Sequence, residues 1–185
     1  MAKLIYITPT SLDGFIADAG NYEWSAPDGE VFAFINDLMR PIGTYLYGRR
    51  MYETLAVWET PDVIPGLTPA MSDFARIWQA ADKIVYSRSL ETVSTRNTHL
   101  EREFDPQAVS DLKTRLPHDA SVAGPTLAAE AIRNGLVDEF HLLVVPAMLG
   151  GGRRILPRGV LAKLDLLDER RLANGWVYLR YRTQA

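Results

Sequence analysis

The sequence contains no cysteine and no long apolar run, and it carries little net charge. Without cysteine, the 185-residue chain has no disulfide, no catalytic thiolate and no cysteine-ligated zinc or iron–sulfur site. No apolar run approaches the ~20 residues that a transmembrane helix needs, and the segment before LIYITP is too short for a signal peptide. A formal net charge of -3 gives no electrostatic reason to expect a nucleic-acid or membrane-surface partner. These features predict a cytoplasmic protein.

What the sequence does contain is the balance of an ordinary globular protein. Hydrophobic residues make up 47% of the chain and charged residues 23%. A length of 185 residues suits one compact domain with a single core, and we expect one domain over residues 1–185. Its three histidines, His99, His118 and His141, lie far apart without metal-ligand spacing, so no metal site is predicted.

Six apolar runs have the length and composition of β-strands. Several are apolar almost throughout, which is typical of parallel strands covered on both faces. The last run alternates, as an antiparallel strand does, and Asn174-Gly175 directly before it predicts a hairpin turn. The strong runs are 4–10, 44–48, 83–87, 121–124, 140–149 and 176–182, and weaker ones are 97–102 and 165–172.

Helical patterns alternate with these strands over most of the chain. Asp105 before Pro106 predicts one helix start, and Pro125 and Gly135 predict the start and end of another. A further helical segment follows Gly48. The alternation predicts an α/β fold with a mostly parallel sheet and an antiparallel C-terminal hairpin. The four longer segments are 29–39, 69–81, 105–116 and 125–135.

Glycine, arginine and serine follow three of the predicted strands. Parallel sheets bind ligands outside the carboxyl ends of their strands. Glycine lets a ligand approach the backbone, and arginine presents a planar fork that suits phosphate oxygens. Each junction alone is also compatible with a simple turn, a surface loop or a helix start, but together they favour a nucleotide with several phosphates. The junctions are Gly48-Arg49-Arg50, Ser87-Arg88 and Gly124-Pro125-Thr126.

The order of four motifs resembles the dihydrofolate reductase superfamily. The motifs are SLDGFIA, YGRRMYE, KIVYSRSL and SVAGPTLAAEAIRNGLVDEFHLLVVPAMLGGGRRIL. Within that superfamily the sequence is most similar to stand-alone relatives of the reductase domain of the riboflavin-biosynthesis deaminase-reductase. The resemblance covers residues 4–182 and implies a three-layer α/β/α fold, bound NADPH and a homodimer paired through the C-terminal strands. The hairpin strand is compatible with that pairing if Trp176, Tyr178 and Tyr181 are exposed.

The resemblance also implies which residues contact NADPH. The first junction would lie along the phosphates, the second would hold the adenosine 2′-phosphate, and the third would approach the pyrophosphate. The third junction reads Ala123-Gly124 where the family has two glycines. The loop 11–17 would lie against the nicotinamide. The implied cofactor residues are Asp13, Gly14, Ile16, Gly48, Arg49, Arg50, Ser87, Arg88, Gly124, Pro125, Thr126 and Leu127.

The proton donor of such a reductase is left open by the sequence. Dihydrofolate reductases use a carboxylate near the start of the first helix, and residues 22–30 resemble that region. Asp28 and Glu30 are both candidates, although the best ungapped register places Gly29 there. Either acid is equally compatible with a structural role at a helix start, and water or a substrate phosphate is an alternative proton source. Candidate substrate-binding aromatics are Trp24, Phe32 and Trp58.

The resulting hypothesis is an NADPH-dependent reductase of a pterin- or pyrimidine-like heterocycle. Phe15 stands where the pyrimidine reductases usually carry a basic residue. The alternative is a non-catalytic nucleotide-binding module on the same fold, whereas the absence of a phosphate-binding loop with Lys-Ser/Thr argues against phosphoryl transfer. Two further segments are interpreted structurally: Asp138-Glu139 as a solvated turn, and residues 150–154 as a flexible turn that is also a candidate contact for substrate or a neighbouring subunit.

Overall fold

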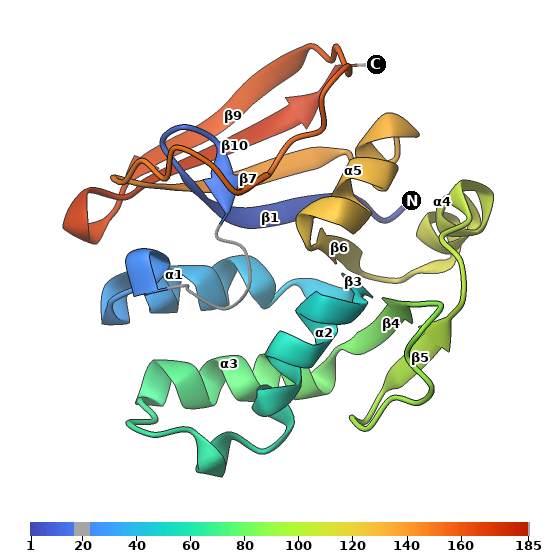
Figure 1. The fold of residues 1–185 in the computed structure, drawn as a ribbon, viewed down its shortest axis with the longest axis horizontal. Coiled ribbons are helices and arrows are strands. Elements are labelled where there is room, and N and C mark those ends of the chain that lie inside the picture. The colour runs from blue at the N-terminus through green and yellow to red at the C-terminus, as the bar shows by residue number, and fades with distance from the viewer. Residues whose placement is uncertain (17–22, 185) are drawn as a thin grey trace.

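A single eight-stranded sheet organises the protein (Figure 1). The computed structural model describes residues 1–16 and 23–184. The sheet has the order β5-β4-β3-β6-β1-β7-β10-β9. Its strands are β1 (Leu4–Ser11), β3 (Ile42–Gly48), β4 (Asp82–Tyr86), β5 (Thr98–Glu101), β6 (Asp119–Ala123), β7 (Glu139–Val145), β9 (Leu164–Arg171) and β10 (Val177–Thr183). The six strands from β5 to β7 are parallel, and β10 runs antiparallel to both β7 and β9. The predicted fold class is confirmed.

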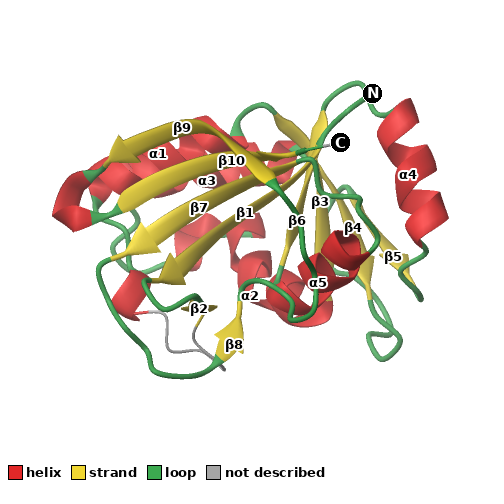
Figure 2. Ribbon diagram, turned by 90° about the horizontal axis from the view of Figure 1, so that it is seen from above, coloured by secondary structure: helices red, strands yellow, loops and turns green. Residues whose placement is uncertain are grey.

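Helices cover the central strands on both faces, and this explains why those strands are apolar throughout. Helices α4 and α5 pack on the face that carries Leu4 and Tyr6 of β1, whereas α1, α2 and α3 pack on the face that carries Ile5. Figure 2 shows the β7-β10-β9 end of the sheet with α1 and α3 behind it. The helices are α1 (Gly29–Met39), α2 (Arg49–Leu55), α3 (Pro69–Ala80), α4 (Pro106–Arg115) and α5 (Pro125–Arg133).

The helix ends follow local capping chemistry. Asp28, Thr68 and Asp105 each accept a backbone N–H from the first turn of α1, α3 and α4. Pro106 and Pro125 occupy first-turn positions, where a missing N–H costs no intrahelical hydrogen bond. These ends agree with the predicted boundaries to within two residues.

The hairpin of β9 and β10 confirms the predicted turn but not the predicted exposure. Asn174 lies in the turn with a positive φ of 55°, and Gly175 follows with a φ of 79°. The exposure of Trp176 and Tyr178 that would suit the dimer pairing is not found, because both are buried in the cluster that includes Val31 of α1. The helix α1 extends under β10 and covers this face of the hairpin.

Three other sequence expectations are corrected. The strand predicted for 140–149 ends at Val145, because Pro146 has no N–H to continue the ladder. Glu139, expected in a solvated turn, is buried at the start of β7. The short strands β2 (Phe15–Ile16) and β8 (Arg153–Arg154) form a separate antiparallel pair that the sequence did not predict.

None of the helices among residues 1–16 and 23–184 is long and apolar enough to cross a membrane.

Candidate functional site

The three glycine and serine junctions lie next to one another at one edge of the sheet. Strands β4, β3 and β6 are neighbours, and they are parallel, so their carboxyl ends meet at that edge. Gly48 pairs with Tyr86, the residue before Ser87, and Tyr47 pairs with Ala123, the residue before Gly124. The fold therefore brings together the three segments that the sequence assigned to phosphate binding.

Gly124 has a backbone conformation that other residues rarely adopt. Its φ is +91° and its ψ is 126°, and it is the N-cap of α5. The carbonyl of Gly124 accepts the first helical N–H, from Ala128. The N–H groups of Thr126 and Leu127 therefore precede the hydrogen-bonded ladder. The Leu127 side chain is buried in the core, which leaves only its backbone for a ligand at this edge.

We expect Gly124→Ala to lower the free energy of unfolding by about 1–3 kcal/mol, because alanine is strained at this φ. A Cβ at position 124 would come no closer than 3.6 Å to Met51, so the cost is conformational rather than steric. Gly48→Ala is the matched control: Gly48 has an ordinary φ of -77°, and open space surrounds the added methyl. Urea unfolding of both variants measures the difference. Equal losses would contradict a special role for the Gly124 backbone.

Arginine side chains stand at two of the junctions. Arg49 donates to Glu53 at 2.7 Å and to Ser89 at 2.9 Å, and its side chain is half exposed. Arg88 forms an ion pair with Glu103 at 3.0 Å, with 80% of the Arg88 side chain exposed. Exposed ion pairs of this kind contribute little and exchange readily, so both guanidinium groups are available to an anion.

Ser87 closes the turn after β4. Its hydroxyl oxygen accepts the backbone N–H groups of Ser89 and Leu90, at 3.3 Å and 3.0 Å. The hydroxyl has its own hydrogen to donate besides. Arg50 is exposed in the first turn of α2.

The loop after β1 is tied to the connection between β7 and β9. Asp13 accepts the N–H of Leu149 at 3.1 Å and that of Gly150 at 2.7 Å. The Ser11 hydroxyl also donates to Asp13, and these hydrogen bonds together lower the pKa of the Asp13 carboxyl to about 2. The Asp13 carboxylate, which the resemblance places against the cofactor, thus already binds the backbone of the connection between β7 and β9. Nearby, Gly14 has a positive φ of 81°.

Ile16 is buried, and its backbone pairs with Arg153 of the connection. Two residues of the stretches singled out by the sequence, Ala17 and Tyr22, lie outside the described residues.

The two candidate acids occupy different environments. Asp28 caps α1: its Oδ1 accepts the N–H of Val31 at 2.9 Å, and its Oδ2 accepts the side-chain amide of Asn174 at 2.5 Å. Glu30 lies exposed in the first turn of α1. The structure therefore gives Asp28 a capping role and places neither acid in a buried apolar pocket.

The three candidate aromatics separate into two groups. Phe32 and Trp58 pack edge to face, with ring centroids 6.2 Å apart, and both also contact Phe74 of α3. Trp24 packs instead against the cluster that contains Val31 and Trp176. The structure brings Phe32 and Trp58 together and places Trp24 elsewhere.

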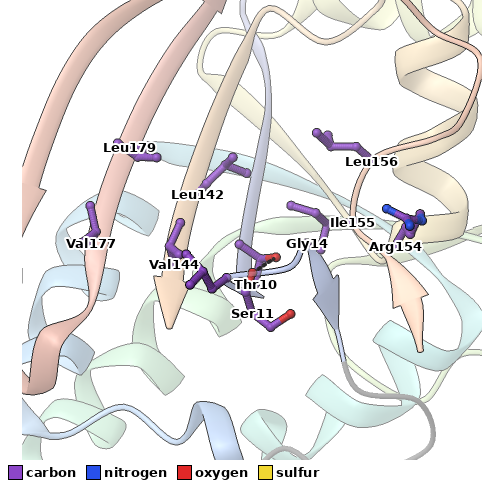
Figure 3. Close-up of a pocket in the computed structure, with 11 residues that line it drawn as sticks. Thr10, Ser11, Gly14, Leu142, Val144, Arg154, Ile155, Leu156, Val177 and Leu179 are labelled. Carbon is purple, nitrogen blue, oxygen red and sulfur yellow. Dashed lines mark hydrogen bonds between the residues drawn. The ribbon is translucent and has the colours of Figure 1, made fainter. Parts of the chain in front are cut away.

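A pocket of about 500 Å³ opens beside the loop after β1 (Figure 3). Its floor is the face of β7 and β10 opposite α1, and its rim includes Arg154, whose guanidinium lies 4.8 Å from the centre of the Phe15 ring. The lining is mostly apolar, with the hydroxyl-bearing residues Thr10 and Ser11 at the turn.

The match that decides the family extends over nearly the whole chain. Residues 2–178 match the RibD C-terminal domain. The chain belongs to the RibD C-terminal domain family. The resemblance found in the sequence motifs is therefore confirmed.

A family relative of similar length is YyaP, an uncharacterized protein of Bacillus subtilis (strain 168). The two sequences are 25% identical over 186 residues, which cover 97% of this chain and 94% of YyaP.

Solved structures share the fold at low sequence identity. A protein of Shewanella sp. PV-4 assigned to riboflavin biosynthesis superposes with a TM-score of 0.76 at 18% identity, covering all of both chains. A pyrimidine reductase-like protein of Corynebacterium diphtheriae gives 0.68 at 13% identity, covering 100% of this chain and 92% of that one.

A two-activity protein of Thermotoga maritima also matches. It is a diaminohydroxyphosphoribosylaminopyrimidine deaminase and 5-amino-6-(5-phosphoribosylamino)uracil reductase, with a TM-score of 0.66 at 14% identity. The match covers 99% of this chain but 57% of the Thermotoga protein. These likenesses establish the fold of the present chain.

Proposed function

We propose that this chain is an NADPH-dependent reductase that transfers hydride to a pyrimidine- or pterin-like heterocycle. The observation that carries the proposal is the alignment of the junctions at Ser87, Gly48 and Gly124 along one edge of the sheet. Membership of the RibD C-terminal domain family supports the proposed reductase activity, because this family is the reductase domain of riboflavin-biosynthesis enzymes.

The residues at this edge fit an extended dinucleotide with three phosphates. Gly48 has open space above its backbone, and Gly124 presents the start of α5. Ser87 and Arg88 stand two strands from Gly124 and would hold the adenosine 2′-phosphate, while Arg49 and Arg50 lie between and would line the phosphate chain. This donor set combines backbone N–H groups with guanidinium groups, which is the chemistry that phosphate oxygens require.

NADPH, when bound, supplies the hydride for the reaction. The chain would contribute by binding and orienting the reactants. Asp28 is not the proton donor that we propose, because both of its carboxylate oxygens accept hydrogen bonds at the start of α1. Water or a phosphate on the substrate is then the proton source that we propose.

We expect Asp28→Ala to lower the free energy of unfolding by about 1 kcal/mol, through loss of the helix cap, and to retain turnover. Glu30→Ala, at an exposed position in the same turn, is the control and should change neither quantity. Steady-state rates across pH and urea unfolding measure the two effects. A large loss of turnover with an altered pH profile in either variant would identify that carboxylate as the proton donor.

The experiment for the proposed reaction is NADPH oxidation followed with two kinds of substrate. A ribosylaminouracil phosphate represents the pyrimidines and dihydrofolate the pterins. Turnover of the first alone would assign the chain to pyrimidine reduction, and turnover of the second alone to pterin reduction. Tight NADPH binding without oxidation by either would favour the second candidate, a nucleotide-binding module, which the capping role of Asp28 and the exposure of Glu30 also suit.

We also propose that the protein is a homodimer, paired through β9 and β10. In the part of the chain that the structure describes, no helix covers the face of this hairpin opposite α1. Leu166 is 50% exposed on that face and Val177 is 38% exposed, beside the apolar pocket floor. The outer strand β9 is also an open edge, which proteins usually cover.

We expect light scattering to give twice the chain mass of 20.7 kDa. Leu166→Glu should shift the protein to the monomer mass, because it places a charge on the apolar face of the hairpin. The control is Val63→Glu, since Val63 is 68% exposed in the turn after α2, away from the hairpin. A wild-type monomer at micromolar concentration would overturn the dimer proposal.

A further inference from the structure

Residues 149–155 form a segment, here called the strap, that runs from the end of β7 across the loop after β1. Asp13 anchors its first two residues, Leu149 and Gly150, through their N–H groups. The pairing of β2 with β8 holds its centre, and the N–H of Ile155 donates to the carbonyl of Gly14 at its end. The strap is therefore bonded along its length to the loop that precedes α1.

Gly152 shows how closely the strap lies on that loop. Its φ is +108°, and a Cβ built on it would lie 3.1 Å from the carbonyl oxygen of Ile16. Only glycine meets both conditions without strain or displacement. The next residue, Arg153, pairs with Ile16 in the ladder, so the position of its backbone is fixed by two neighbouring contacts.

The Arg153 side chain reaches the start of α5. Its Nη1 donates to the Thr126 hydroxyl oxygen at 3.3 Å. Thr126 is two residues after Gly124, in the junction assigned to the pyrophosphate. The following residue, Arg154, turns elsewhere and lies over the Phe15 ring. The Arg153 side chain thus lies at the sheet edge assigned to the nucleotide, whereas the Arg154 side chain points away from that edge.

We propose that Arg153 binds the diphosphate of the dinucleotide, and that Asp13 is the residue that positions it through the strap. This inference rests on the proposed NADPH-binding function. In the sheet, β6 lies between β3 and β1. The Arg49 guanidinium donates to Ser89 after β4, on the far side of β3, whereas Arg153 reaches the junction after β6 from the side of β1. A diphosphate there would be held by the charge of Arg153 and by the first N–H groups of α5.

The test is calorimetric titration of the full-length wild type, Arg153→Ala and Arg153→Lys with NADPH, NADH and adenosine 2′-monophosphate. Loss of a charge-assisted hydrogen bond should raise the Kd of Arg153→Ala for both dinucleotides by the same factor, roughly ten- to a hundredfold. The 2′-monophosphate lacks the diphosphate, and its affinity should stay within about twofold. Arg153→Lys should recover part of the loss. Arg158→Ala, at an exposed turn further along the same connection, is the charge-matched control.

The positioning role of Asp13 needs a separate readout. Asp13→Asn replaces one acceptor oxygen by an NH2 group, so only one of the N–H groups of Leu149 and Gly150 still finds an acceptor. Introduced into the wild type, this change should weaken dinucleotide binding. Introduced into Arg153→Ala, it should cause no further loss of affinity, because both changes act through the Arg153 side chain. Additive losses in the double variant would overturn the positioning role of Asp13.

The outcomes separate the inference from the function on which it rests. If the wild type binds neither dinucleotide, the proposed function fails. If the wild type binds NADPH and Arg153→Ala binds it equally well, the function stands and this inference is overturned. A loss of 2′-monophosphate binding equal to that of NADPH would likewise show that Arg153 acts on the fold or the adenosine end rather than on the diphosphate.

Discussion

Replacing Arg88 with alanine should weaken NADPH binding by about 1.5–3 kcal/mol, which is the cost of a lost hydrogen bond between charged groups. NADH lacks the 2′-phosphate, so its affinity should barely change. The Arg88 side chain is well exposed after β4 and forms an exposed ion pair with Glu103. Titration of both cofactors into the wild type and the variant measures the preference directly.

Glu103→Gln provides the control for Arg88. It removes the ion-pair partner and leaves the guanidinium in place, so NADPH should bind at least as tightly as to the wild type. Equal losses of NADPH and NADH affinity in Arg88→Ala would mean that this arginine does not recognise the 2′-phosphate.

The largest effect on stability is expected at Glu139, at the opposite edge of the sheet. This carboxylate is 2% exposed. Lys3 donates to Oε1 at 2.7 Å, and Arg180 donates to Oε2 at 2.8 Å. His141 lies 3.1 Å from the same oxygen through Nε2, and its Nδ1 is 3.0 Å from the Tyr178 hydroxyl. The buried charge is thus compensated on both oxygens.

We expect Glu139→Gln to lower the free energy of unfolding at pH 7 by roughly 3 kcal/mol, because it replaces a buried carboxylate by an amide and leaves Lys3 and Arg180 without their compensating charge. Asp165→Asn is the control. Asp165 accepts from Arg182 at 2.8 Å, but that ion pair is exposed, and its loss should cost at most about 1 kcal/mol. Urea unfolding of the two variants gives the comparison, and equal losses would contradict the account of Glu139.

The same network predicts how stability depends on pH. Burial alone would raise the pKa of Glu139, but the hydrogen bonds from Arg180, Lys3 and His141 outweigh it and lower the pKa to about 2. The folded state therefore binds this proton less readily than the unfolded chain, whose glutamate has a pKa near 4.5. The stability that Glu139 contributes is complete above pH 4.5 and is lost as the pH falls toward 2.

His141 also makes the folded state less stable as the pH falls, but its effect begins at a higher pH than that of Glu139. Burial lowers its pKa below 6.5, against the opposing effect of Glu139, so the unfolded chain binds this proton more readily. Stability should begin to fall just below pH 6.5 for this reason. In a pH series of urea unfolding, the difference between wild type and Glu139→Gln should shrink below pH 4.5. A constant difference down to pH 2 would exclude the Glu139 carboxylate as its source.

Local patterns predicted the parallel core and the edge where the junctions meet. Helix α1 is predicted at its observed bounds because its apolar face is encoded within 29–39. The positions of Gly48 and Gly124 followed from strand ends alone, since parallel strands end at a common edge. These features depend on residues that are close in sequence.

Features that depend on distant residues were not predictable in this way. Asp13 and Leu149 are 136 positions apart, and nothing local to either indicates their hydrogen bond. The burial of Tyr178 depends on where α1 lies, and that of Glu139 on donors brought from β1 and β10. A charged residue at a strand start was read as solvated because its partners are separated from it in the chain.

The most direct test of the central claim is titration of the purified wild-type protein with NADPH and, separately, with NADH, by calorimetry or tryptophan fluorescence. The aligned junctions at Ser87, Gly48 and Gly124 predict tight binding of NADPH and clearly weaker binding of NADH. Binding of neither cofactor would contradict the account and leave the fold without the proposed function.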